Sequence, residues 1–213
     1  MKKFIFLLFC CIYLISYSQQ KNGISVGTTI STINMSQEPF SSGWIPGFYV
    51  ELTSRISGKN EKLFLRPSLG FSREGTSLTY TSIWITPDGT NDQLLSPESS
   101  SQKIFLNKTY ILLDIEYSLD NFINGLAILA GVNVDYLISK RENSQNLGVA
   151  FYQTSSMSIR ERTNASIDLG VNYNFGLASV ELKYALHFIN FGSLSATSYR
   201  VPHVIKIGLL YFV

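Results

Sequence analysis

Nine charged side chains lie at alternate positions of predicted β-strands, on the face opposite a run of apolar residues. They are Glu51, Arg55, Arg66, Asp114, Glu116, Asp168, Glu181, Lys183 and Lys206. Acids and bases on one face of a sheet could form a binding site, a narrow polar path or structural ion pairs. The interior of a small closed barrel is just wide enough for its side chains, and buried charges persist when they are paired. We therefore interpret the set as a structural network rather than a transport path.

A nucleophilic pair is the second chemistry that the sequence could support. His187 and His203 lie close in sequence to several loop serines, and a Ser–His pair near a membrane surface could serve a lipid-modifying hydrolase. The candidate serines are Ser193, Ser195 and Ser198. No acid can be assigned to orient either histidine, and no nucleophile-elbow motif selects one serine. We expect a protein that is not an enzyme.

Metal and cofactor sites are not predicted. Asp88 and Asp92, in the segment ITPDGTND, could contact calcium, but Pro-Asp-Gly is foremost a turn signal and the distal glutamate of a calcium loop is missing. The two histidines do not make a zinc site without cysteine partners. We expect neither a metal nor a cofactor.

The N-terminal residues have the three-part order of a secretory signal peptide. Two lysines precede an apolar run from Phe4 to Ile15, and Ser16 and Ser18 stand before the expected cut. The run is short for a membrane-spanning helix, and the residues before Cys10 and Cys11 do not suit a lipoprotein signal. We predict a signal peptide over residues 1–18 and one domain over residues 19–213.

Cleavage after Ser18 would remove both cysteines and two of the 17 basic residues. The remaining 15 would balance the 15 acidic residues. A mature chain with no net charge and no basic tract is not expected to bind nucleic acid. It would also lack a disulfide, so its fold must be stabilised in another way.

Period-two alternation with abundant Tyr, Phe, Val, Ile and Thr indicates an all-β protein. The predicted strands are residues 24–33, 47–56, 62–74, 110–119, 126–139, 165–175, 178–188 and 204–213. Short turns at 57–61, 120–125 and 175–177 alternate with long loops at 34–46, 75–109, 140–164 and 189–203. This parity is typical of an eight-stranded antiparallel up-and-down transmembrane β-barrel with short periplasmic turns and long extracellular loops.

Each strand can be phased so that its outer face carries no charge. A slip of one residue would place Glu51, Arg66 or Asp168 in lipid. A soluble barrel would show the reverse, with polar residues outside and apolar residues within. Pro67 lacks a backbone donor, so we expect a local bulge in its strand.

The segment 75–109 is too long to be only a connection, and it carries aromatic and apolar residues. Tyr80, Ile83, Trp84 and Ile85 form a candidate recognition loop, because binding residues concentrate on long surface loops of rigid scaffolds. The alternative is a hairpin that extends the barrel above the membrane, with SLTYTSIWIT as one arm.

Several segments resemble the Bacteroidota outer-membrane β-barrel domain family, often called PorT-like. They are GISVGTTIST, FLRPSLGFSREG, AILAGVNVDYLISKRE, SIDLGVNYNFG, SVELKYALHFINF and the closing VIKIGLLYFV. The resemblance covers nearly the whole mature chain, although Phe212 here precedes a terminal Val213 instead of ending the chain. It implies a small barrel of the cell envelope, and its loose motifs identify an architecture better than an activity.

We therefore expect a monomeric outer-membrane barrel with a periplasmic N-terminus. Its partners would be outer-membrane lipid and an envelope or secretion-complex protein, bound through the extracellular loops. A lipid-modifying enzyme, a narrow pore and a secreted soluble barrel are the alternatives.

Overall fold

The computed structural model describes residues 20–33, 40–57, 62–82, 98–145, 162–187 and 202–213. Its eight strands are β1 (Gln20–Ile33), β2 (Phe40–Ser57), β3 (Leu63–Ser82), β4 (Glu98–Ser118), β5 (Leu126–Gln145), β6 (Thr163–Asn174), β7 (Ala178–His187) and β8 (Pro202–Phe212). Within these ranges no helix is long and apolar enough to cross a membrane. The predicted signal peptide lies outside the described residues.

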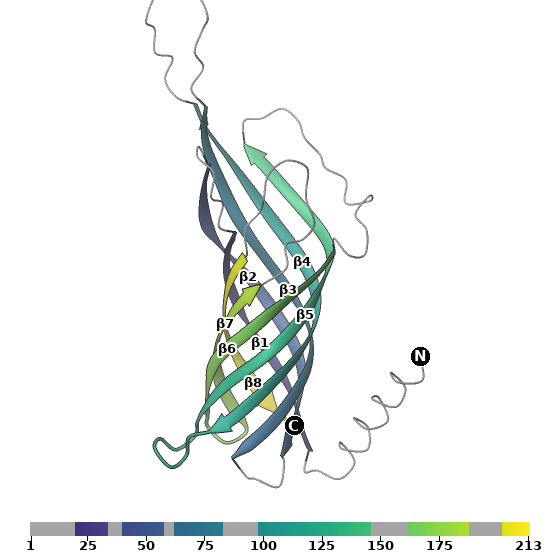
Figure 1. Ribbon diagram of the computed structural model, residues 1–213, viewed down its shortest axis with the longest axis vertical. Helices are drawn as coiled ribbons and strands as arrows, with labels where there is room; N and C mark the ends of the chain where they lie inside the picture. The colour runs from purple at the N-terminus through teal and green to yellow at the C-terminus, as the bar shows by residue number, and fades with distance from the viewer. Residues whose placement is uncertain (1–19, 34–39, 58–61, 83–97, 146–161, 188–201) are drawn as a thin grey trace, which may run out of the picture.

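The described strands form one closed antiparallel barrel in which every strand pairs with its neighbours in sequence. The first and last strands complete the wall, for example through the opposed residues Val26 and Leu209. Closure satisfies the backbone groups that an open sheet would leave at its edges. Figure 1 shows the strands crossing the barrel axis obliquely, as a closed wall requires.

The outer surface of the barrel is an apolar belt. Ile111, Leu69 and Val132 are each more than half exposed, and comparable side chains occur on all eight strands. Aromatic pairs belong to this belt: the ring centres of Phe48 and Phe71 lie 5.9 Å apart, and those of Tyr173 and Phe175 lie 4.8 Å apart. The outward phase predicted for each strand is confirmed.

The short turns lie at the end of the barrel that also holds the C-terminus (Figure 1). Gly125 and Gly176 have φ of 83° and 98°, a conformation that suits glycine. Asp120 accepts hydrogen bonds from Ser118 Oγ at 2.5 Å and Gly125 N at 2.8 Å. These two donors hold the pKa of the Asp120 carboxyl below its usual range.

Strand length differs sharply between the two sides of the barrel. β3, β4 and β5 have 20, 21 and 20 residues, whereas β6, β7 and β8 have 12, 10 and 11. The longer strands continue past the ends of the shorter ones, at the end opposite the short turns (Figure 1). We call residues 40–44 of β2, 73–82 of β3, 98–107 of β4 and 139–145 of β5 the extension.

The extension corrects three predicted loop boundaries. Residues 40–44, 75–82, 98–109 and 140–145 were expected in loops, but the structure places them in strands. The face that carries apolar residues changes there. The buried residues include Leu78, Ile104 and Leu106, while the exposed Lys103 points outward. Apolar residues therefore face inward in the extension, as in a soluble sheet. Strands predicted from an apolar outer face end where that face stops, so their predicted ends come too early.

The bulge expected at Pro67 is wrong. Pro67 keeps its register with Leu113 of β4, and the β2–β3 register is the same on both sides of it. The missing donor instead leaves a gap in the β2–β3 ladder, between the pairs Thr53–Ser68 and Ile56–Leu65. Register shifts occur at Trp44/Phe48 and at Asn107/Lys108, where the wall leaves the belt.

Candidate functional site

The structure places all nine predicted charged residues in the barrel lumen. Eight are buried to 2% exposure or less, and the side chain of Arg55 is 18% exposed near the short-turn end. The alternation that turns apolar residues toward the outside turns these side chains inward. The lumen is therefore the densest cluster of titratable groups in the described part of the chain.

Arg66 is the centre of the largest ion-pair network. Its Nη1 donates to Glu116 Oε2 at 3.2 Å, and its Nη2 donates to Glu181 Oε1 at 2.6 Å. Glu116 also accepts a hydrogen bond from Arg55 Nη2 at 2.6 Å. The planar guanidinium can serve two carboxylates at once, which an ammonium group would do with less geometric control.

Lys183 continues this network toward the middle of the barrel. Its Nζ donates to Asp114 Oδ2 at 2.8 Å and lies 3.6 Å from Glu51 Oε1. A third carboxylate oxygen, Glu181 Oε2, lies 3.8 Å away. Glu51 also accepts a hydrogen bond from the Tyr110 hydroxyl at 3.1 Å.

These contacts cross the lumen. The pair Arg66–Glu181 joins β3 to β7, and these two strands lie on opposite sides of an eight-stranded ring. Lys206 of β8 lies 4.5 Å from the ring centre of Tyr110 on β4, again across the barrel, and 3.5 Å from Asp168. Cross-lumen pairs tie distant parts of the wall together, which adjacent-strand hydrogen bonds cannot do.

A second buried cluster, which the nine predicted residues do not include, lies near the long-loop end. Lys108 Nζ donates to Glu74 Oε2 at 2.5 Å and to Asp135 Oδ2 at 3.1 Å, and His187 Nε2 lies 3.3 Å from Asp135 Oδ2. Lys108 fell within a predicted loop, so its inward direction was not recognised. A strand prediction for residues 98–109 would have revealed it.

Two tyrosines occupy space that glycines leave free inside the wall. A Cβ added at Gly208 would lie 2.0 Å from the Tyr49 hydroxyl oxygen, and one added at Gly70 would lie 2.3 Å from Tyr110 Cζ. Both rings are buried and both hydroxyls reach the polar network, Tyr49 lying 3.2 Å from Ser25 Oγ. The rings therefore fill the lumen between the charged groups.

The two histidines have different surroundings. The expectation that no acid orients either of them is wrong for His187, since Asp135 lies beside it. His203 Nδ1 lies 2.5 Å from the Tyr184 hydroxyl. The candidate nucleophiles Ser193, Ser195 and Ser198 fall outside the described residues.

The candidate recognition loop is only partly described. The backbone of Tyr80 lies in β3 and pairs with Phe40 and Ser100. Ile83, Trp84 and Ile85 lie outside the described residues. For residues 75–82 and 98–109 the hairpin alternative is therefore confirmed.

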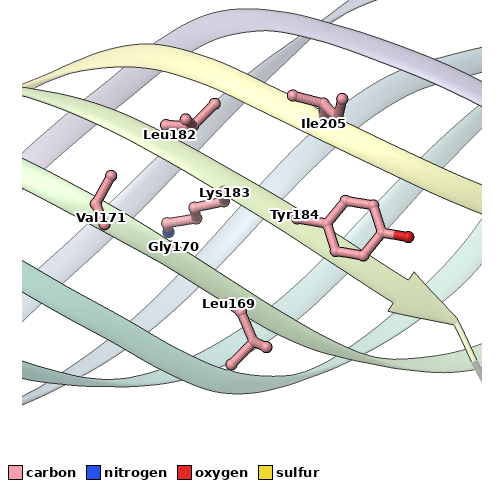
Figure 2. Close-up of a pocket in the computed structure, with 7 residues that line it drawn as sticks. All are labelled: Leu169, Gly170, Val171, Leu182, Lys183, Tyr184 and Ile205. Carbon is pink, nitrogen blue, oxygen red and sulfur yellow. The ribbon is translucent and has the colours of Figure 1, made fainter.

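A shallow groove of about 270 Å³ lies between β6, β7 and β8. Figure 2 shows the residues that line it, which are Leu169, Gly170, Val171, Leu182, Lys183, Tyr184 and Ile205. The groove belongs to the apolar belt and offers no convergent set of polar groups. In the described ranges no group of three His, Cys, Asp or Glu side chains could hold a metal ion.

An apolar outer belt around a charged, filled lumen defines the class of protein. Ile, Leu and Val side chains exposed around the belt are unfavourable in water and favourable in lipid, and the charged side chains lie inside the wall, away from the lipid. The chain is an eight-stranded transmembrane β-barrel.

No family model matches the sequence, and no curated protein matches it. Solved structures of similar fold include Neisserial surface protein A, with 11% identity and a TM-score of 0.48, covering 89% of this chain and 96% of that one. Another is Ail, the attachment invasion locus protein of Yersinia pestis, with 12% identity and a TM-score of 0.36, covering 92% and 99%. At such identities the likeness concerns the fold alone.

Proposed function

We propose that this protein is a non-enzymatic outer-membrane barrel that acts in recognition, or in envelope or secretion assembly, through the strands and loops at its long-loop end. This end would face the outside of the cell, with the N-terminus in the periplasm. The single observation that carries the proposal is the extension, which continues four strands beyond the apolar belt.

The extension has the features of a binding platform. Its outward face carries polar side chains such as Ser77, Thr79 and Ser101. Leu78, Ile104 and Leu106 on its inward face are buried, so their packing supports the sheet. A rigid sheet above a membrane offers a larger recognition surface than a minimal barrel needs.

The lumen supports a structural role rather than transport. Side chains that bridge opposite walls, such as Arg66 with Glu181 and Lys206 with Tyr110, occupy the space that a permeating ion would need. We infer that the ion pairs hold the barrel closed and stiff. The resemblance of the sequence to PorT-like barrels agrees with an envelope role and adds no particular partner.

Photo-crosslinking in intact cells tests the recognition role. A photoreactive residue at Thr79 or Ser101, on the outward face of the extension, should give one defined protein adduct. The same residue at Leu182, on the outward face of the short strand β7, is the matched control and should give lipid adducts only. Identical adducts at all three positions would contradict a role for the extension in protein recognition.

A further inference from the structure

A basic patch lies on the outward face of the extension, directly beyond the apolar belt. Phe71 and Tyr136 are among the last belt residues on β3 and β5, and Arg73 follows two positions after Phe71. Arg73, Lys103 and Arg141 surround Phe105 on three adjacent strands. We call Arg73, Lys103, Phe105 and Arg141 the basic patch.

The strand registers bring these residues together. Phe105 is opposite Gly75 on β3 and opposite Arg141 on β5, while Lys103 lies two positions further along β4. The Arg73 guanidinium lies over the Phe105 ring, 4.5 Å from its centre. Gly75 carries no side chain, so nothing separates the guanidinium from the ring.

The charged side chains described on this face are basic. The described outward side chains of the three strands beyond the belt include Ser77, Thr79, Ser101, Asn107 and Ser139, and none of them is a carboxylate. The buried carboxylate of Glu74 points into the lumen, where it pairs with Lys108. The patch therefore presents positive charge to whatever lies just beyond the hydrocarbon layer.

The place and chemistry of the patch select one ligand. Aromatic residues mark the level where hydrocarbon meets headgroups, and the basic residues begin within two positions of that level. Arginine forms strong charge-assisted hydrogen bonds with phosphate oxygens, and cations next to anionic headgroups gain favourable energy. A guanidinium stacked on an aromatic ring is also held in place before it binds.

We propose that the basic patch binds the phosphate groups of lipids in the leaflet at the long-loop end. Arg73 and Lys103 are the principal contacts, and Phe105 positions Arg73. The inference rests on the proposed outer-membrane placement, and it adds a defined headgroup site that would fix the depth and tilt of the extension over the membrane.

The test compares diphosphorylated lipid A with its dephosphorylated form. The full chain, folded in neutral detergent micelles, is titrated with each lipid, and the lipid retained per barrel is measured by native mass spectrometry. The wild-type protein should retain the phosphorylated lipid about tenfold more strongly. The double variant Arg73→Gln/Lys103→Gln should lose most of that preference.

Two further variants test whether the preference depends on the place of a cation and on the ring that holds Arg73. Lys21→Gln removes one exposed cation near the short-turn end and should leave the preference unchanged. Phe105→Leu keeps every charge but removes the ring under Arg73, and it should weaken the preference about two- to threefold.

The outcomes distinguish this inference from its premise. If the chain does not show heat-modifiable migration in the same micelles, the barrel has not folded there, and both the membrane placement and the patch are overturned. If it folds but retains both lipids equally, only the phosphate site is overturned, and the patch would then suit an acidic protein. Retained preference in the double variant would also overturn it.

Discussion

Replacing Arg66 with leucine should lower the free energy of unfolding by about 3–5 kcal/mol, because two buried carboxylates lose the guanidinium that pairs with both. Arg66 is fully buried and serves both Glu116 and Glu181. The change is measured by urea unfolding of the barrel in lipid vesicles, with the folded fraction determined from heat-modifiable gel migration. Lys21→Leu, at an exposed position, should shift the stability by no more than about 0.5 kcal/mol.

A double variant sharpens this prediction. Arg66→Leu/Glu181→Leu removes one charge of each sign, so it should be more stable than Arg66→Leu alone. Glu116 would keep Arg55 at 2.6 Å in both variants. An Arg66→Leu protein as stable as the wild type would show that the network does not hold the barrel, and the lumen would need another explanation.

Placing arginine at Val132 should destabilise the folded barrel in membranes by about 2–4 kcal/mol. Val132 is 58% exposed in the middle of the belt, opposite Leu113 on β4 and Ile167 on β6. A charge at this position would have to enter the hydrocarbon layer. Folding yield and unfolding midpoint in phosphatidylcholine vesicles measure the effect.

The matched control is Ser101→Arg, which adds the same side chain to an outward position of the extension. It should fold and insert like the wild type, because this position lies beyond the belt. A secreted soluble barrel would tolerate both substitutions equally, so similar stabilities for the two variants would contradict a membrane location.

Sequence reasoning predicted the barrel and its two faces because lipid imposes one rule on every strand. A charge anywhere on the outer wall is unfavourable, so the phase of each strand can be read from the positions of Glu51, Arg66 and Asp168. The same rule predicted which charged residues enter the lumen. Their burial follows directly from the phase.

The extension was predicted only as an alternative for one hairpin, because that rule stops at the edge of the belt. Beyond it Ile104 and Leu106 face inward and Lys103 faces outward, so a pattern defined by lipid no longer identifies the strand. Lys108 was missed for the same reason, because it fell within the predicted loop 75–109, whereas Glu74 ended a predicted strand and was not assigned to the inner face.

The partners of the lumen charges could not be predicted either. The contact between Arg66 and Glu181 depends on the tilt and stagger of strands that are 115 residues apart in sequence. Alternation gives the direction of each side chain but not its height in the barrel. The pairing of His187 with Asp135 was likewise hidden, because the two strands are not adjacent.

Labelling of single cysteines in intact cells tests the central claim most directly. Ser101→Cys lies on the extension, and Asn124→Cys lies in the turn between β4 and β5, at the opposite end of the barrel. A membrane-impermeant maleimide should label Ser101→Cys in intact cells and Asn124→Cys only after the outer membrane is opened. Labelling of both positions in intact cells, or of Asn124→Cys alone, would contradict a transmembrane barrel that presents its extension outside the cell.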